Sequence, residues 1–456
     1  MKKIINEFTP YPEGSIKELL AISLPLILSM LSSTAMSFFD RLILAKYDTQ
    51  AMNAAVVAGL AASIFQYGAM GIASISEVFV GQYNGAKKHH KIGEPVWQMI
   101  WFSAFTLFLF VPLGLWGGTY FVPNPEYLKE GVPFFKWSLL FSWVYPLAIA
   151  LSSFFVGRGC VKLVTFTAIL SNIINIVLDF ILIFGIQNIL EPMGAKGAAI
   201  ATGLSEILQI LILFWVFLNA RHRQQHGTGC IKFNPKLFWQ TIRIGVPNSI
   251  SSIIEVTAWS VLAQILTSVS ESHITVYSVG ESFFGLFAFA FWGLQKGATT
   301  IAANYAGANR EEILSKTLIS GGKIILMIML FLSIPIFCFP EELVKLFLNE
   351  EIEPDMKRYM ISAMHWLWVY FMLDAISWII SGILTAVGDT RFVMMMNGFS
   401  AWFCYVLPVY ICVSVMGGAP DLCWIISAFY GLTNTICFFL RFKSKQYRSQ
   451  PLHANA

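Results

Sequence analysis

The first long apolar stretch of the chain, residues 22–44, contains a carboxylic acid. A helix needs about 20 mostly apolar residues to cross a bilayer, so this stretch is long enough to span a membrane. Asp40 lies near its far end, and the helical period places Ser33 and Ser37 on the same face. An acid in such a helix faces a bundle or a water-filled cavity and not lipid. We therefore expect this polar face to line an interior.

The rest of the chain has the same apolar character. Of its 456 residues, 56% are hydrophobic and only 12% are charged, whereas soluble domains carry about 25% charged residues. The sequence therefore predicts an all-α polytopic membrane protein, and the short alternating segments of a transmembrane barrel are not found. Apolar runs predict twelve transmembrane helices near residues 19–44, 53–80, 95–121, 132–156, 162–187, 195–219, 238–268, 275–305, 313–339, 359–386, 391–416 and 421–441.

The basic residues predict the orientation of these helices. Most of the 30 Lys and Arg residues fall in segments on the side of the N-terminus, and few fall in the opposite loops. The positive-inside rule then places both termini in the cytoplasm, and an even number of spans agrees. We expect a multi-pass protein of the cytoplasmic (inner) membrane, in contact with membrane lipids, monomeric, and without nucleic acid as a partner. The seven cysteines show no paired spacing, so neither disulfides nor a metal motif is indicated.

The two halves of the chain resemble each other. A shift of 222 residues aligns GQYNGAKK at 81–88 with ANYAGANR at 303–310, and a shift of 229 aligns GCVKLV at 159–164 with GDTRFV at 388–393. Repeats of this kind are common in transporters. Because each half holds six helices, the halves share an orientation and are related by a pseudo-two-fold axis along the membrane normal. This geometry leaves a cleft between two lobes.

The repeat also predicts the domain boundaries. We expect an N-terminal six-helix lobe at residues 1–219 and a polar cytoplasmic linker at 220–237. A C-terminal six-helix lobe at 238–441 and a cytoplasmic tail at 442–456 complete the chain.

The fifth predicted helix carries three polar residues on one face. Asn172, Asn175 and Asp179 stand at positions i, i+3 and i+7. Carboxylate and amide oxygens are suitable ligands for a hard cation such as Na⁺, and a lone buried carboxylate can bind a proton instead. With Asp40, this face forms a candidate cation site in the N-terminal lobe. Hydrogen bonds that only tie helices together are the alternative role.

The C-terminal lobe carries a second group of acids, next to aromatic residues. Glu255 is followed one turn later by Trp259, and Tyr370 precedes Asp374 by one turn. A carboxylate beside aromatic rings attracts an organic cation through charge and cation–π interactions. One carboxylate cannot hold cargo and coupling ion with full affinity at once, which is a physical basis for exchange. Helix packing is again the alternative.

Other residues in the predicted spans have weaker signals. Four residues are candidates to line a pliable cargo cavity, although such residues also serve packing or lipid contact in membrane helices, and they are Phe283, Phe287, Trp259 and Met395. The remaining ionisable residues have no defined role, and they are Arg41, Glu77, Glu206, Glu281 and Lys296.

At this point the motifs resemble multidrug and toxic compound extrusion (MATE) transporters, over nearly the whole chain. The resemblance rests on Pro25 and Asp40 in the first helix, GQYNGA closing the second helix, GDTRF after the tenth, and two six-helix lobes. It implies export of organic cations and other amphipathic compounds in exchange for Na⁺ or H⁺, through a V-shaped cleft between the lobes. Arg41 departs from the pattern, because a small polar residue usually follows the first-helix acid.

Two branches of that family are represented in the candidate sites. Glu255 and Asp374 are similar to the cation-coupling acids of the NorM-type branch. Asn175 and Asp179 are similar to the N-lobe cation site of the DinF-type branch, which also uses the first-helix acid, here Asp40. The resemblance therefore implies cation coupling at these five residues, with Na⁺ held by Asp40, Asn175 and Asp179 if Na⁺ is the ion. Asn172, Ser33, Ser37 and Tyr370 are expected to support them.

The sequence thus predicts a secondary active antiporter that exports amphipathic, cationic small molecules by alternating access. No cofactor is expected other than Na⁺ or H⁺ as the coupling ion. A lipid-linked oligosaccharide flippase is the alternative, but its phosphate-bearing cargo calls for a central basic cluster, and only Arg41 and Lys296 are basic within the spans. An enzyme is not expected because no catalytic motif is present. A channel is disfavoured because unlike lobes provide no ring of equivalent filter residues.

The acids themselves do not repeat between the halves. Asp374 aligns with Tyr145 under the 229-residue shift, and Glu255 aligns with Ser33 under the 222-residue shift. We infer that the lobes have different tasks, with ion coupling mainly in the N-terminal lobe and cargo binding with a second cation site in the C-terminal lobe.

Separate Asp40→Asn and Glu255→Gln variants test this division. We expect Asp40→Asn to lose mainly the ion-dependent signal and Glu255→Gln to lose mainly the cargo-dependent signal, because the two acids serve different ligands. Ion-gradient dependence and cargo binding are measured for each variant in reconstituted vesicles. Equal loss of both signals in the two variants would exclude a division of labour.

Overall fold

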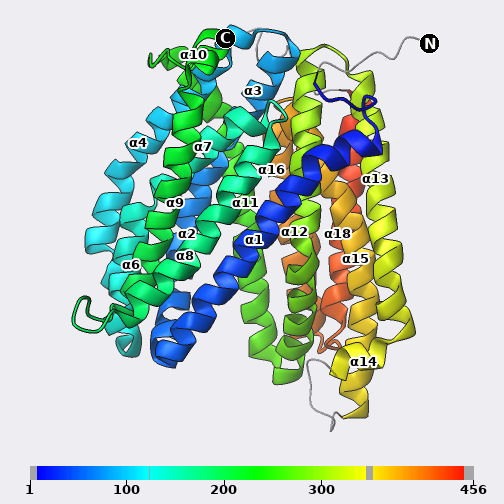
Figure 1. The fold of residues 1–456 in the computed structure, drawn as a ribbon. Coiled ribbons are helices and arrows are strands. Elements are labelled where there is room, and N and C mark those ends of the chain that lie inside the picture. The colour runs from blue at the N-terminus through cyan, green and yellow to red at the C-terminus, as the bar shows by residue number, and fades with distance from the viewer. Residues whose placement is uncertain (1–7, 123, 346–352, 446–456) are drawn as a thin grey trace. The chain divides into compact units, whose positions relative to one another are not determined.

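The computed structural model describes residues 8–122, 124–345 and 353–445 (Figure 1). Within these residues, twelve helical segments are long and apolar enough to cross a membrane. The prediction of an all-α protein with twelve spans is therefore confirmed. Of the predicted cytoplasmic tail, residues 446–456 lie outside the described part of the chain.

The first half of the chain forms the following helices in order: α1 (Ile16–Tyr47), α2 (Thr49–Ala73), α3 (Ile75–Gly85), η1 (His89–Lys91), α4 (Gly93–Trp116), α5 (Gly118–Phe121), η2 (Pro125–Tyr127), α6 (Leu128–Phe141), α7 (Val144–Val156), α8 (Val161–Phe184), α9 (Gly194–Phe217) and α10 (Ala220–His226). The second half forms α11 (Pro235–Val269), α12 (Glu271–Gly307), α13 (Glu312–Ser333), η3 (Ile334–Cys338), α14 (Pro340–Lys345), α15 (Pro354–Ala386), α16 (Thr390–Phe399), η4 (Ser400–Val406), α17 (Leu407–Val409), η5 (Tyr410–Val415) and α18 (Leu422–Ser444).

The helices group into two compact units. Among the described residues, the N-unit contains 28–122, 124–249 and 303–309, and the C-unit contains 8–27, 250–302, 310–345 and 353–445. The three helices α1, α11 and α12 each contribute residues to both units.

Small residues allow close helix packing in the N-unit. There α8 packs on α9, α2 packs on α6, and α4 packs on α7. Side chains without bulk let helix backbones approach closely in a membrane protein. On α9, Gly197 lies against the backbone of Leu182 on α8, and Gly203 lies against the ring of Phe141 on α6. The buried face of α2 is made of alanines, which are Ala51, Ala54, Ala55, Ala58, Ala62, Ala69 and Ala73.

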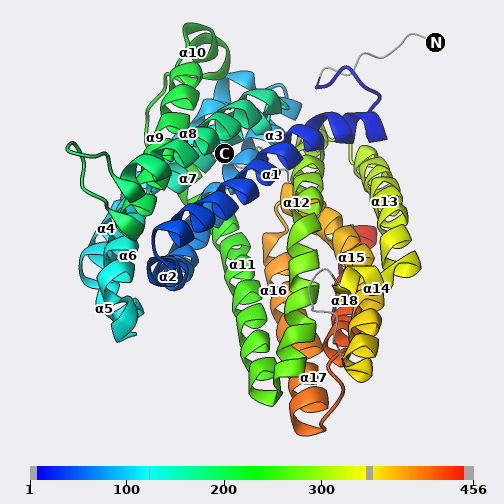
Figure 2. The same ribbon diagram turned by 60° about the horizontal axis from the view of Figure 1, so that its bottom comes forward.

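The C-unit is centred on α15, which packs against α18 and α13 (Figure 2). The span at Thr390–Val415 alternates between α and π geometry, and Pro408 lies within it. Proline lacks the backbone N–H that an α-helix needs, so neighbouring residues adopt wider turns. The same local cause applies to η3, which contains Pro335. These wide turns change the direction of side chains along the helix.

Two predicted helices contain breaks. The predicted helix at 132–156 is divided into α6 and α7 at Ser142 and Trp143. Pro146 cannot donate a hydrogen bond to the carbonyl of Ser142, four residues earlier. The next carbonyl along the chain, that of Trp143, accepts a hydrogen bond from Ser103 Oγ on α4 at 2.6 Å. The predicted helix at 53–80 is likewise divided into α2 and α3, at Ser74.

The segment predicted as a linker is attached to the N-unit. Residues 220–226 form α10, and side chains of α4 hold the residues that follow. Trp97 Nε1 donates to the carbonyl of Thr228 at 2.8 Å. Gln98 accepts from the backbone N–H of Asn234 at 2.9 Å. This segment is therefore anchored and not a loose tether.

The close approach of α8 and α9 predicts that Gly197→Ala destabilises the protein. A Cβ atom at Gly197 would lie 2.7 Å from the carbonyl carbon and oxygen of Leu182, so the helix backbones would have to separate. We expect a loss of about 1–3 kcal/mol in the free energy of unfolding, measured by thermal unfolding in detergent.

Gly322→Ala on α13 is the matched control, since a Cβ atom there meets nothing within 4 Å. This change should be neutral, or stabilising by up to about 1 kcal/mol. Equal effects of the two substitutions would show that helix propensity, and not close packing, decides the outcome.

Candidate functional site

Two carboxylic acids meet inside the N-unit. Asp40 near the end of α1 and Asp179 on α8 lie within hydrogen-bonding reach of each other. Asp179 is fully buried, and neither of its carboxylate oxygens meets a hydrogen-bond donor in the described part of the chain. An ionised carboxylate only accepts hydrogen bonds, so the two acids bond to each other only when one of them carries a proton.

Asn175 lies one turn before Asp179 and completes this cluster. In the amide orientation that satisfies both of its ends, Asn175 donates from Nδ2 to Asp40 Oδ1 at 2.9 Å and accepts from the backbone N–H of Thr202 at 3.3 Å. Asn175 is fully buried. The structure thus brings together the three residues predicted for the N-lobe cation site, and the amide ties α1, α8 and α9 at that point.

The predicted serine face has a more limited role than expected. Asn172 Nδ2 donates to Ser32 Oγ at 2.8 Å and contacts Ser33 Oγ at 3.5 Å. The hydroxyls of Ser33 and Ser37 donate to backbone carbonyls one turn earlier in α1. Ser32 is the nearer partner of Asn172, but it was not among the residues predicted for the site.

Tyr145 and Arg41 also lie near enough to act on Asp40, and Tyr145 was not predicted as a member of the site. Tyr145 on α7 lies in the electrostatic field of Asp40 and of Glu206 on α9. The repeat contained a signal for Tyr145, because this residue aligns with Asp374 of the other half. Arg41 is exposed and acts on Asp40 through charge alone.

In the C-unit, Asp374 on α15 is buried and hydrogen-bonded. Its Oδ2 accepts from Tyr370 Oη at 3.1 Å, and its Oδ1 accepts from Ser377 Oγ at 3.3 Å. Glu255 on α11 is near enough to act on Asp374 through charge. The structure therefore brings together Glu255, Tyr370 and Asp374, as predicted for a second cation site.

Aromatic rings enclose this acid pair within the C-unit. The ring centroid of Tyr370 lies 6.1 Å from those of Trp259 and Phe284 and 6.3 Å from that of Tyr430. Trp259 also contacts Tyr405, at 5.3 Å. These rings pack on one another beside the acids, and aromatic rings together with carboxylates are the groups that attract an organic cation.

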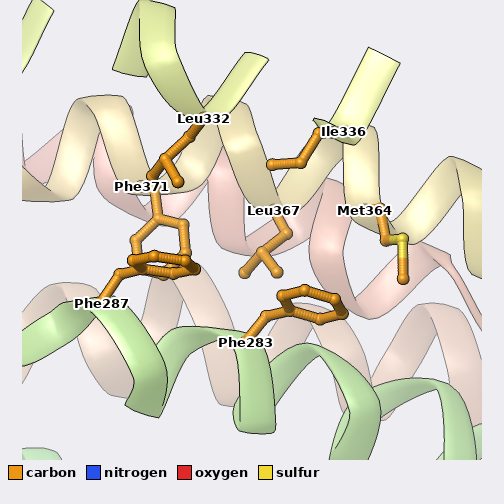
Figure 3. A pocket seen from close by; sticks show the side chains of 7 residues that line it. All are labelled: Phe283, Phe287, Leu332, Ile336, Met364, Leu367 and Phe371. Carbon is orange, nitrogen blue, oxygen red and sulfur yellow. The ribbon is translucent and has the colours of Figure 1, made fainter. Parts of the chain in front are cut away.

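Of the predicted cargo-lining residues, Trp259 belongs to the aromatic group beside these acids, whereas Phe283 and Phe287 line a cavity whose lining includes neither acid. Phe283 and Phe287 of α12 point into a small apolar cavity (Figure 3). The space open to the centre of a water molecule there is about 10 Å³, which is about one water molecule and too small for a drug-sized compound. Met395 on α16 is 68% exposed. The other residues that line the cavity are Leu332, Ile336, Met364, Leu367 and Phe371.

Glu281 is a further, half-buried acid of the C-unit. Its Oε1 has no hydrogen-bond partner within the described residues. Its charge acts on Tyr277 and Tyr405. Glu281 therefore lies beside the aromatic enclosure, but no contact with Asp374 or Glu255 places it in that site.

Comparison with known proteins agrees over most of the chain. The family model described as MatE matches residues 25–181 and 247–411. A protein of Thermotoga maritima described as probable multidrug resistance protein NorM is 22% identical over 390 residues, which cover 85% of this chain and 83% of that protein.

Solved structures share the fold. One is an outward-facing multidrug resistance MATE family transporter of the MOP superfamily, with a TM-score of 0.81 and 18% identity. Another is a MOP superfamily transporter from Pyrococcus furiosus, with a TM-score of 0.79 and 19% identity, for which a reversed polarity of the binding pocket suggests a different function. Both matches cover 97% of each chain.

Proposed function

Because the chain belongs to the MatE family, whose members are transporters and not enzymes, we propose that it is a secondary active antiporter. In this proposal it exports amphipathic, cationic organic molecules in exchange for Na⁺ or H⁺ by alternating access. The chain is a multi-pass membrane protein with twelve candidate spans. The proposal places it in the cytoplasmic membrane as a monomer with both termini in the cytoplasm, in line with its basic loops.

The observation that carries the proposal is the contact between Asp40 and Asp179. Two negative charges about 4 Å apart repel each other by about 4 kcal/mol at the effective dielectric constant near a protein surface. A proton or a sodium ion between the acids removes this repulsion. The amide of Asn175 adds a polar group beside them, and the carboxylate oxygens suit a hard cation.

Occupancy of this cluster would bias the position of α1. This helix contributes residues to both units, with the boundary at Ile27 and Leu28. Pro25 lies two residues before that boundary and leaves a backbone hydrogen bond unmade. We infer that cation binding between Asp40 and Asp179 holds the second part of α1 against α8, and that loss of the cation releases it.

The aromatic enclosure of the C-unit is the proposed cargo site. Asp374 and Glu255 supply negative charge, and Trp259, Tyr370 and Tyr405 supply ring faces. An organic cation would be attracted by both, and it would compete there with a small inorganic cation.

The flippase alternative is less favoured. A cargo with a phosphate group needs positively charged groups at its binding site. The two sites described above are built from carboxylic acids, amides, hydroxyls and aromatic rings. Their chemistry selects cations.

Transport by the purified protein in vesicles tests the proposal. Ethidium, a fluorescent cation, is the cargo probe, and a Na⁺ gradient and a pH gradient are applied separately. We expect transport under at least one gradient. Asp179→Asn should reduce the gradient-driven rate by about tenfold or more, because losing about 1.4 kcal/mol of ion binding already changes occupancy tenfold.

Glu191→Gln is the matched control, because Glu191 is an exposed acid of the same unit. It should transport ethidium like the unmodified protein. No ethidium transport under either gradient would contradict the antiporter proposal and favour the flippase. Undiminished coupling in Asp179→Asn would remove the acid pair from the mechanism.

A further inference from the structure

Three basic side chains surround one phenylalanine ring at an end of the N-unit. Arg158, just after α7, places its Cζ 4.5 Å from the ring centroid of Phe154. The rings of His222 and His226, both on α10, lie 5.2 and 5.7 Å from the same centroid. Helix α10 lies at the same end of the N-unit as α3 (Figure 1). Arg158, His222 and His226 lie outside the candidate spans, and Phe154 lies in the last turn of one.

Two nitrogen atoms of this cluster are buried without a partner. Arg158 Nη1 and His226 Nδ1 make no hydrogen bond within the described residues. The His226 side chain is well buried, since the residue is only 8% exposed. Most buried polar atoms in proteins have a partner, and leaving one without costs about 1–3 kcal/mol. Two such atoms around one ring leave hydrogen-bonding capacity that a small polar ligand would satisfy.

The surrounding charges indicate the sign of that ligand. Burial, together with the charges of the nearby Arg158, His222 and His89, lowers the pKa of His226 to about 4. Burial also lowers the pKa of Arg158, and Arg221 adds to this effect. Cys160 acts on Arg158 in the opposite direction, and none of the groups that act on these two residues is a carboxylate. Arg158 and Arg221 therefore supply the positive charge of the cluster, and the neutral histidines become positive only when protonated.

The corresponding turn of the C-unit shows what the N-unit lacks. There Arg441 also stacks on a phenyl ring, that of Phe392, with 4.8 Å from Cζ to the centroid. Its Nε donates to Asp389 Oδ2 at 2.7 Å. Under the 229-residue shift, Asp389 aligns with Cys160. Arg158 aligns with Val387 and Arg441 aligns with Ile212, so the two arginines are not equivalent. The N-unit turn nevertheless holds Cys160 where the C-unit turn holds an acid.

We propose that Arg158, His222 and His226 form a binding site for an oxyanion of the phosphate class, either the headgroup of an anionic phospholipid or free phosphate. Arginine and imidazolium donors suit phosphate oxygens. An open groove on α9 and α10 runs beside the cluster from Leu211 to Arg223, and Trp215 in this groove is 79% exposed. Such an apolar groove next to a basic cluster favours the lipid headgroup as the source.

The site should bind more tightly as the pH falls. His226 already has a hydrogen bond to the backbone of His89, and because Nδ1 is the atom without a partner, this bond belongs to Nε2. The neutral ring then presents a lone pair at Nδ1, which repels an anion. Protonation of Nδ1 turns it into a donor, so a bound anion raises the pKa of His226. Affinity should rise by up to about tenfold per pH unit between pH 8 and 6.

Binding to the full-length protein in neutral detergent tests the site. The thermal unfolding midpoint is titrated with inorganic phosphate in one arm. In the other arm the unfolding midpoint is titrated with phosphatidic acid. Diacylglycerol with the same acyl chains is the control, because it lacks the phosphate group. We expect the midpoint to rise with at least one of the phosphate probes and not with diacylglycerol. A rise with phosphatidic acid alone would identify the ligand as a lipid headgroup, and a rise with inorganic phosphate would identify it as the free anion.

Variants separate this site from general charge effects. Arg158→Gln should weaken binding by about tenfold, because a charge-assisted hydrogen bond is lost. Arg158→Lys keeps the charge and should bind better than Arg158→Gln. His226→Gln should flatten the pH dependence. Arg391→Gln removes an exposed arginine of the C-unit and should bind normally. No midpoint shift with either phosphate probe, or equal loss in Arg158→Gln and Arg391→Gln, would overturn the proposal.

Discussion

The contact between Asp40 and Asp179 is the interaction on which the account depends. A bundle of apolar helices has little means of stabilising two neighbouring negative charges. The contact therefore requires a cation or a proton, and the amide of Asn175 and the backbone of Thr202 hold the site in place. Because Asp40 lies on a helix that contributes to both units, its occupancy can be linked to a change elsewhere in the chain. In the proposed mechanism, ion binding and movement share this helix.

Duplication explains the scaffold better than it explains the chemistry. Both halves use long helices and close contacts at small residues, but their polar groups differ at equivalent positions. Asp374 corresponds to Tyr145, and Asp389 corresponds to Cys160. The first difference gives each half its own acids. The second places Cys160 in the N-unit turn where the other half has the acid that pairs with Arg441. A duplicated fold can thus acquire separate sites by changing single residues.

The sequence predicted the twelve spans because apolar length is a property of the chain alone, which the bilayer imposes on every span. It also predicted the grouping of Asp40, Asn175 and Asp179, since helical spacing and the family resemblance pointed to the same residues. It missed the division at Ser142, where the partner of a backbone carbonyl comes from Ser103 on another helix. It missed Ser32 and the cluster around Phe154 for the same reason, because contacts between distant segments leave no local pattern.

The central claim is that Asp40 and Asp179 share a single proton when no other cation is bound. Infrared difference spectroscopy of the purified protein at neutral pH, without Na⁺, measures this directly through the carbonyl stretch of a protonated carboxylic acid. The account predicts one such band that disappears in Asp179→Asn and remains in Glu191→Gln. A spectrum without that band, or a band unchanged by Asp179→Asn, would contradict it.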